Sequence, residues 1–475
     1  MLLPLLLAAC APMHLPPPSP VAAVEALRPR LDAADADLAL QRLRAYLEIP
    51  SLTPAEGDGQ VRAVEQLAAW LAEDGIEAEV DRFAPGMANL VARLPANVRP
   101  APSGEGPLCL LSHVDVVPAE TDRWQHAPFA AEIDEAGWLH GRGVLDMKGI
   151  GILELSAFRE LAAADVPRRR DVVLLAVSDE EGENAGARRL AERWSTLGCS
   201  HVLNEGGMGV RGAVVDDLTT FGVSTTEKGH LWARLVAHGP PGHGSTPRPD
   251  DAPARLMDAL ARLQRFRPAV RVQPQLTELL ADVGRHAGGL TGAVLRSPGA
   301  TRVLAVPALR AEPLTAAILA DTVHVTGFGG AEAPNVVPSE VWAQLDVRLL
   351  PGTSVDAMAE ALRAVVAPIP EVELVVLSAA PAAVSPTEDP VYAAIVRQLR
   401  LAFPDAAVGP LVMPGSTDCA YLRPLGAHCY GVAPFPLPPE VLEGMHGDDE
   451  RLPVEVFRHG LDVFFAIVLE ATLPP

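Results

Sequence analysis

The alternation of apolar and polar positions predicts an α/β protein from about residue 25 onward. Short runs that are apolar at every position alternate with segments whose apolar residues recur every three or four positions. The first pattern is typical of strands in a mostly parallel sheet that is covered on both faces, and the second of helices. The predicted strands are 108–111, 171–178 and the stretch just before residue 203. The predicted helices are 31–49, 57–75, 151–164 and 184–198.

The pattern changes near Lys228, where half-exposed strands replace the fully apolar runs. The order of elements that follows fits a compact βαββαβ unit of about 150 residues. Its strands are predicted at 229–239, 335–351 and 372–380, and its helices at 251–266 and 354–367. Residues 266–320, rich in Gly, Pro and Ala, are irregular and give no assignable element. After residue 385 the pattern returns to a helix, short strands and a long final helix.

This organisation is most simply explained by one α/β domain that is interrupted by a smaller domain. A chain of 475 residues with 49% hydrophobic residues is long enough to bury the cores of two domains. The predicted segments are a leader and tether (1–24), the first part of the large domain (25–225), the inserted domain (226–381) and the second part of the large domain (382–475).

Composition excludes some partners and singles out a few residues. The net charge of -22 argues against nucleic acid or an anionic membrane as a partner. Only two of the 38 basic residues are lysines, Lys148 and Lys228, so these positions are expected not to accept arginine. The five cysteines have no CxxC spacing and do not resemble a disulfide framework. Cys109 is expected to be a small buried apolar residue.

The N-terminal stretch MLLPLLLAAC is too short to span a bilayer and resembles the end of a bacterial lipoprotein signal. Cleavage before Cys10 would leave a lipid-modified cysteine followed by a proline-rich tether, and the protein would reside in the cell envelope. Because no Lys or Arg precedes the apolar run, a cytoplasmic location stays open as the alternative.

Chemistry-bearing residues follow the predicted strands at the points where those strands end. In an open parallel sheet, ligands bind outside the carboxyl ends of the strands. The residues in these places are His113, Asp115, Asp146, Glu180, Glu181 and Glu205. Taken singly, Asp146 and Asp179 could be helix caps and His113 a structural histidine. Their recurrence at equivalent places in successive βα units favours a common site.

Converging carboxylates repel one another unless a cation lies among them, and no cluster of Lys or Arg is nearby in the sequence. Oxygen and imidazole ligands without thiolate suit zinc, with cobalt or manganese as alternatives. A paired site needs one bridging carboxylate and about two further protein ligands for each ion. His446, in the polar EGMHGDDE loop, supplies the histidine that the strand ends lack.

The motifs HVDVVP, GRGVLDMKG, SDEEGEN, NEGG and GHGSTP, with the late His446, together resemble the dinuclear zinc peptidase and amidohydrolase family. This family includes aminoacylases, acetylornithine deacetylase, succinyl-diaminopimelate desuccinylase, carboxypeptidase G and carboxypeptidase S-like enzymes. The resemblance spans roughly residues 35–465. It implies an α/β catalytic domain with a mostly parallel sheet and an inserted ferredoxin-like α+β domain that serves as a lid or for dimerisation.

The resemblance also implies a ligand set for two zinc ions. His113 and Glu205 would bind one ion, and Glu181 and His446 the other. Asp146 would bridge the two ions. Each carboxylate would thus be paired with a cation, which explains why acids can end neighbouring strands.

Further roles follow from the same resemblance. Asp115 would orient the ring of His113. Glu180, adjacent to a ligand, would take a proton from the bridging water and deliver it to the leaving amine. The peptide Asp146–Met147 would be cis. His243 would donate to the developing oxyanion, reaching across from a second copy in a homodimer formed by the inserted domain.

A second set of residues resembles the part of the family's site that binds substrate. Asn335 and Arg348 resemble a pair that holds a carboxylate, for which the planar guanidinium is suited. Arg348 could equally be a surface residue of a strand. Gly415, Ser416 and Thr417 resemble a glycine-turn loop that closes on the substrate backbone.

Glutamate rather than aspartate at position 205 resembles the carboxypeptidase and aminoacylase side of the family. Together with Arg348, this resemblance favours a substrate with a free α-carboxylate, either an N-acyl amino acid or the C-terminus of a small peptide. A biosynthetic deacetylase or desuccinylase is the runner-up, and a non-catalytic metal-binding relative is a further alternative. The GMGVRG segment (207–212) is not a dinucleotide fingerprint because a strand-like stretch follows it. No G-x-S-x-G elbow of a serine hydrolase is present.

Overall fold

The computed structural model describes residue 24 and residues 32–55, 57–98, 105–164, 166–311, 313–330 and 333–474. The predicted leader and tether, with Cys10, lie outside the described residues apart from Val24. Among the helices of the described ranges, none combines the length and the apolar character that a membrane span requires.

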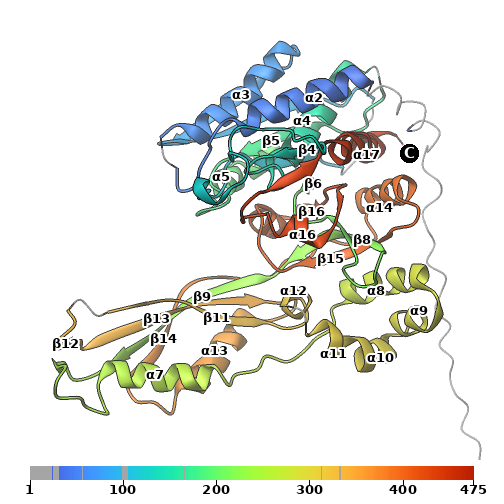
Figure 1. Cartoon of the computed structure of the whole chain (residues 1–475). Helices are drawn as coiled ribbons and strands as arrows, with labels where there is room; N and C mark the ends of the chain where they lie inside the picture. The colour runs from blue at the N-terminus through green and yellow to red at the C-terminus, as the bar shows by residue number, and fades with distance from the viewer. Residues whose placement is uncertain are drawn as a thin grey trace, which may run out of the picture.

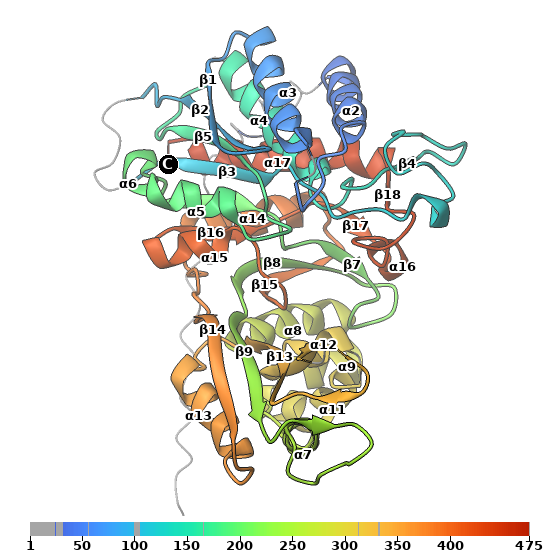
Figure 2. The ribbon, with the colours of Figure 1, turned by 90° about the vertical axis from the view of Figure 1, so that its left-hand side faces the viewer.

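The large domain is built on a ten-stranded mixed sheet with the order β1-β2-β5-β3-β6-β16-β8-β7-β17, in which β15 pairs with β8 (Figures 1 and 2). Its central strands β5, β3, β6 and β16 are parallel. The strands are β1 (Ala78–Ala84), β2 (Met87–Leu94), β3 (Leu108–His113), β5 (Val172–Val177), β6 (His201–Asn204), β7 (Gly209–Arg211), β8 (Thr219–Glu227), β15 (Ala407–Met413), β16 (His428–Gly431) and β17 (Pro436–Leu437). A separate pair is formed by β4 (Trp138–His140) and β18 (Arg451–Pro453).

Helices cover both faces of this sheet, as the fully apolar strands predict. Within β3, Leu108 and Leu110 pack into one core while Cys109 and Leu111 pack into another. Figure 2 shows α2, α3 and α4 on one side of β3 and α5 on the other, and residues of α17 share the core that holds Leu108 and Leu110. The helices are α2 (Ala33–Leu47), α3 (Gly59–Glu73), α4 (Lys148–Ala163), α5 (Ala185–Glu192), α6 (Trp194–Leu197), α14 (Pro390–Ala402), α15 (Cys419–Leu422), α16 (Pro439–Leu442) and α17 (Val454–Thr472), with short 3-10 turns η2 (Thr121–Arg123) and η4 (Arg423–Leu425).

The inserted unit is a four-stranded antiparallel sheet with the order β11-β13-β9-β14, against which α7 and α13 pack. This is the order of a ferredoxin-like fold, so the predicted fold class is confirmed. The elements are β9 (Gly229–His238), α7 (Ala252–Leu263), β11 (Thr322–Gly329), β13 (Glu340–Leu349), α13 (Val355–Val366) and β14 (Val372–Ala380), with a small pair β10 (Gly242–His243) and β12 (Val336–Val337). This inserted unit, from β9 to β14, is called the lid from here on. Figure 1 shows the lid underneath the large domain, where β8 continues into β9.

The segment 266–320, irregular by sequence, is mostly helical in the structure. Its helices are α8 (Pro274–Ala287), α9 (Gly289–Leu295), α10 (Pro298–Ala300), the π-helix η3 (Thr301–Ala305), α11 (Val306–Leu309) and α12 (Pro313–Ala317). Four of them, α8, α9, α10 and α12, begin at Gly or Pro, and these residues interrupt the long periodicity that predicts a helix. Helix α8 packs against β15 of the large domain, and buried Asp282 accepts a hydrogen bond from the Val408 amide at 2.7 Å.

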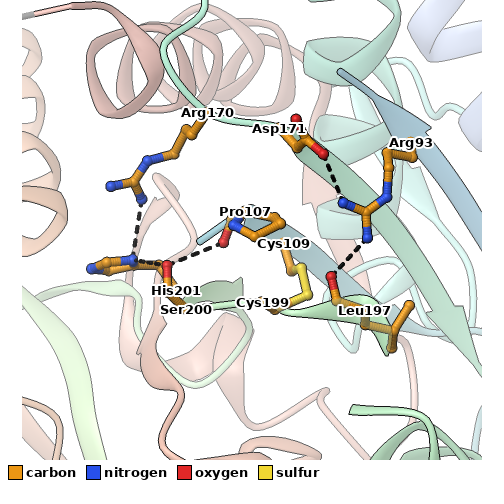
Figure 3. The surroundings of a disulfide bond; sticks show 9 residues. All are labelled: Arg93, Pro107, Cys109, Arg170, Asp171, Leu197, Cys199, Ser200 and His201. Carbon is orange, nitrogen blue, oxygen red and sulfur yellow. Dashed lines mark hydrogen bonds and ion pairs between the residues drawn. A yellow bond between two sulfur atoms is a disulfide. The ribbon is translucent and has the colours of Figure 1, made fainter. Parts of the chain in front are cut away.

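Cys109 is buried, as expected, but the expectation that the cysteines form no disulfides is wrong, because Cys109 and Cys199 are joined by one (Figure 3). The two residues are 90 positions apart, with Cα atoms 5.9 Å from each other. Cys109 lies on β3 and Cys199 just before β6, and these strands are neighbours in the sheet. Spacing along the chain carries no sign of this pairing, which depends on strand order. Cys419 and Cys429 are free and buried.

Candidate metal centre

The site lies at the carboxyl ends of three adjacent strands. β5, β3 and β6 run parallel, so the residues that follow them meet at one edge of the sheet. Two further loops reach this edge, one before α4 and one before β18. Together they bring in His113, Asp146, Glu181, Glu205 and His446, and Glu180 lies beside them.

The turn after β5 places Glu180 and Glu181. Asp179 adopts a left-handed backbone with φ 69°. Its carboxylate accepts hydrogen bonds from the amides of Glu183 and Ala185, both at 3.2 Å. Aspartate tolerates this conformation because its short side chain can bond the local backbone. The turn therefore ends the strand and directs the two glutamates toward the sheet edge.

The donor atoms form two groups that share one carboxylate. In the first, His113 Nε2 lies 3.1 Å from Asp146 Oδ1 and 3.7 Å from Glu205 Oε1. In the second, His446 Nε2 lies 3.1 Å from Asp146 Oδ2 and 2.8 Å from Glu181 Oε1. Each group thus holds one imidazole, one glutamate and one oxygen of Asp146, as the resemblance implied.

These groups fit a pair of divalent cations. Ligands at about 2.0–2.2 Å from a tetrahedral ion lie roughly 3.2–3.6 Å apart, close to the observed separations. The ring of His113 donates from Nδ1 to the Asp115 carbonyl at 3.0 Å, which leaves Nε2, 3.1 Å from Asp146, as the nitrogen that an ion would use. Within the described ranges, no lysine or arginine pairs with Asp146 or Glu181, whose partners are histidines.

The titration of the cluster shows the same shortage of positive charge. Burial, together with neighbouring acids, raises the pKa of Glu180 and of Glu205 well above the usual range. Hydrogen bonds to Asp146 and Glu181 raise the pKa of His446 to about 10. Burial opposes a similar rise at His113, but Asp146 and nearby acids still raise its pKa. Protons on these glutamates and histidines therefore supply the positive charge that bound cations would otherwise supply to the cluster.

Asp115 acts differently from the sequence-based expectation. Its backbone carbonyl, rather than its carboxylate, orients the ring of His113, and the nearest carboxylate oxygen is 3.7 Å from Nδ1. The buried carboxylate instead accepts hydrogen bonds from the amides of Glu180 at 3.1 Å and Glu181 at 3.0 Å, and from the Thr53 hydroxyl. Asp115 thereby fixes the peptides that carry both glutamates.

No sequence pattern points to Glu450, yet it organises the loop that carries the shared ligand. Its fully buried carboxylate accepts bonds from Arg142 Nη1 and from the amides of Gly143 and Leu145 at 2.7–2.8 Å. Arg142 also donates to the Gly447 carbonyl at 2.6 Å, next to His446. One ion pair thus ties together the two loops that carry Asp146 and His446. The Asp146–Met147 peptide in this loop is cis, as the resemblance implied.

The residues expected to contact substrate fall into three groups, two of which lie far apart on the lid. His243 and Asn335 lie together on the exposed β10–β12 pair, where the Gly244 amide donates to the Asn335 carbonyl at 2.9 Å. Figure 1 shows β12 at the end of the lid farthest from the large domain. Arg348 lies at the opposite end of β13, bonded to Asp346 at 2.8 Å. The ten residues of β13 span roughly 30 Å.

The third group is the loop between β15 and α15. Thr417 is buried, and both its amide and its hydroxyl donate to Glu227, while Gly415 and Ser416 precede it at the surface of the loop. The next residue, Asp418, is fully buried, and neither of its oxygens has a hydrogen-bonding partner in the described ranges. Burial, with nearby acids, raises the pKa of Asp418 to about 7.

The fold and the paired donor groups define a metal-dependent hydrolase, and comparison with known proteins agrees. Residues 109–470 match the model of peptidase family M20/M25/M40, and the chain belongs to this family. It is 28% identical over 379 residues to the probable carboxypeptidase S-like 2 of Dictyostelium discoideum, covering 76% of this chain and 71% of that protein. It is also 28% identical over 430 residues to human aminoacylase-1, covering 89% and 92% of the two chains. The protein is therefore a hydrolytic enzyme.

Solved structures share the fold at low sequence identity. The metallo-carboxypeptidase Sso-CP2 of Sulfolobus solfataricus superposes with a TM-score of 0.69 at 18% identity, covering 91% of this chain and 99% of that one. Human carnosine dipeptidase 1 gives a TM-score of 0.67 at 17% identity, with 95% and 99% covered. The YXEP protein of Bacillus subtilis, described as a dinuclear metal-binding peptidase, gives 0.56 at 14% identity, with 93% and 100% covered.

Proposed function

We propose that this enzyme hydrolyses an amide or peptide bond next to a free carboxylate, as a carboxypeptidase or an N-acyl-amino-acid amidohydrolase. The observation that carries this proposal is the shared carboxylate of Asp146, which lies 3.1 Å from both His113 and His446. A bridging aspartate between two histidine–glutamate pairs is the arrangement that a two-metal hydrolytic site needs.

Two zinc ions suit the donor set, with cobalt or manganese as alternatives. His113, Glu205 and one oxygen of Asp146 would hold one ion, and His446, Glu181 and the other oxygen the second. Bound metal would supply a more acidic water and a polarised scissile carbonyl.

Glu180 is the proton-transfer group in this proposal. Its amide is anchored on Asp115, and its side chain belongs to the same donor cluster as His113 and Glu205. The carboxylate takes a proton from the attacking water and delivers it to the leaving nitrogen. Its neighbours Glu181 and Glu205 serve as ligands, so Glu180 remains available for proton transfer.

Substrate selection is assigned to Arg348, Asn335 and the loop 415–417. Arg348 would hold the free α-carboxylate with its planar guanidinium. Human aminoacylase-1 and the carboxypeptidase S-like protein are the kinds of relative that favour this assignment over a biosynthetic deacetylase or desuccinylase.

A homodimer through the lid is part of the proposal, since His243 and Asn335 lie at the tip of the lid. A second copy could present them to this site, where His243 would donate to the developing oxyanion. Mixing two inactive variants, Glu180→Gln and His243→Ala, tests this directly. Hybrid dimers with one intact site should recover activity, whereas no recovery would show that His243 does not act across an interface.

For the cellular address, we propose the cell envelope, with Cys10 as the lipid attachment site. The Cys109–Cys199 disulfide supports this, because such bonds persist in oxidising compartments and are rare in the cytosol. Fractionation of cells that express the full chain, with the Cys10→Ala variant as control, separates this from a cytoplasmic location.

The activity test uses zinc-loaded enzyme and a panel of N-acyl amino acids and blocked dipeptides, each paired with its C-terminal amide. Cleavage of the acids but not the amides is expected. Equal cleavage of both would remove the carboxylate clamp. No cleavage of any substrate with two metals bound would favour a non-catalytic relative.

A further inference from the structure

The two chain crossings between the large domain and the lid run side by side. The chain enters the lid after Glu227, at the end of β8, and has returned by Ser385. The Ser385 amide donates to the Thr225 carbonyl at 2.8 Å, and the Thr226 hydroxyl donates to the Ala383 carbonyl at 2.8 Å. A rotation of the lid relative to the large domain would therefore bend this paired segment.

A buried ion pair joins this crossing to the large domain. The side chains of Glu227 and Arg423 are only 4% and 3% exposed and are in direct contact. Arg423 also donates from Nε to the Ser385 hydroxyl at 3.2 Å and from Nη2 to the Cys429 carbonyl at 3.2 Å. The pair therefore touches the outgoing crossing, the returning crossing and strand β16.

The same glutamate holds the loop expected to close on substrate. The Thr417 amide donates to Glu227 at 2.9 Å, and the Thr417 hydroxyl donates to the other oxygen at 2.7 Å. The Ser416 hydroxyl lies 3.5 Å from the same carboxylate. Glu227, at the end of β8 where the chain enters the lid, thus holds Thr417 of the substrate loop through two hydrogen bonds.

A buried ion pair is rarely the most stable way to fill such a space, since apolar residues of similar volume often serve as well. What the pair does provide is fixed geometry, because the Glu227 carboxylate accepts from Thr417 on both oxygens and from Arg423 on one of them. The pair is therefore better explained by positioning than by stability.

We propose that Glu227 is a positioning residue that, with Arg423, couples the lid to the substrate loop 415–417. This inference rests on the proposed function, in which that loop contacts substrate. A movement of the lid at the crossing shifts the carboxylate, and the Thr417 amide and hydroxyl move with it. Closure of the lid and ordering of the loop are then one event.

Glu227→Gln is the sharpest perturbation because it keeps the shape of the side chain. The amide group of glutamine would face either Arg423 or Thr417 with a donor instead of an acceptor. Glu470→Gln is the matched control, since Glu470 is a buried carboxylate that accepts from Arg397 and Gln398 between α14 and α17, away from the crossing. Both substitutions remove a buried charge, but of the two glutamates only Glu227 contacts the loop 415–417.

Steady-state kinetics supply the first readout. We expect Glu227→Gln to raise KM by about tenfold while kcat changes by less than about threefold, since a loop that has lost a charged acceptor must be ordered by the substrate. Glu470→Gln should leave KM unchanged. Arg423→Gln should have the same effect as Glu227→Gln, and the double variant should be no worse than either single variant.

Hydrogen exchange supplies a second readout that needs no activity. In Glu227→Gln the peptide 413–419 should exchange about tenfold faster, and in Glu470→Gln at the wild-type rate. Ser385→Ala is the milder variant, because Ser385 contacts Arg423 but not the loop; it should also increase exchange in 413–419. Unchanged exchange in both Glu227→Gln and Ser385→Ala would overturn the coupling. Wild-type enzyme without activity on the panel would instead refute the proposed function and leave the exchange result decisive for the coupling.

Discussion

Glu450 provides a quantitative test of how the metal centre is built. Its carboxylate accepts four bonds, from Arg142 and Gly143 on one oxygen and from the amides of Leu145 and Asp146 on the other. Glu450→Gln keeps the volume but turns one side of the group into a donor. Either Arg142 or the amide of Leu145 is then left facing another donor in a buried place.

The magnitude follows from these bonds. Each bond to a charged acceptor contributes about 1.5–3 kcal/mol, and the two bonds to one oxygen are lost, so the free energy of unfolding of the metal-free protein should fall by about 3–6 kcal/mol. The affected loop carries Asp146, the shared ligand. Loss of such outer support typically lowers metal affinity about 10–100-fold.

Urea unfolding of the metal-free protein measures the first quantity, and competition with a chelator of known affinity measures the second. Glu440→Gln, an exposed change on nearby α16, is the control and should alter neither. A destabilised Glu450→Gln with wild-type metal affinity would show that the loop finds its geometry without this carboxylate, which would refute the reasoning.

Three further predictions concern the base, the disulfide and a buried acid. Glu180→Gln should retain both metals by elemental analysis while turnover falls about 10²–10⁴-fold; near-normal turnover would remove it as the base. Cys199→Ala should lower the free energy of unfolding in urea by about 2–4 kcal/mol, and a reductant should have no further effect on the variant. Although burial opposes it, hydrogen bonds from His201 and His428 lower the pKa of Asp389 to about 2. Ionised Asp389 therefore contributes about 1–2 kcal/mol to the free energy of unfolding. This contribution is complete above the ordinary aspartate pKa and is lost as the pH falls toward 2. In Asp389→Asn the free energy of unfolding, measured by urea titration at several acidic pH values, should therefore depend less on pH.

Sequence could predict those parts of this enzyme in which the order of residues along the chain determines where they lie in the fold. An apolar run followed by an acid places that acid at the end of a strand, and parallel strands share one edge. This is why His113, Glu181 and Glu205 can be grouped from the order of residues alone. His446 follows only because the donor set at the strand ends lacks one histidine.

The parts that sequence could not predict depend on which elements become neighbours. Cys109 and Cys199 meet because β3 pairs with β6, and no spacing rule encodes that pairing. Glu450 reads as one acid among several in GDDE, and only the fold shows four donors converging on it. The helices that follow α8 in 266–320 are three to seven residues long, too brief to establish a period.

The two lysines show how composition and structure can be combined. In a chain that otherwise uses arginine, Lys148 and Lys228 mark places where three rotatable donors on a compact ammonium are needed. Lys148 Nζ is fully buried and donates to the carbonyls of Tyr46 and Ile49, which fixes the end of α2 against the loop of the shared ligand. Lys228 Nζ donates to the carbonyls of Ala317 and Ala320 beside the lid crossing. Burial lowers the pKa of Lys148 to about 7 and of Lys228 to about 8, a cost that these main-chain acceptors offset. The compact lysine ammonium suits these buried positions better than the larger, planar guanidinium, at the places where the loop of Asp146 and the lid are each joined to the rest of the fold.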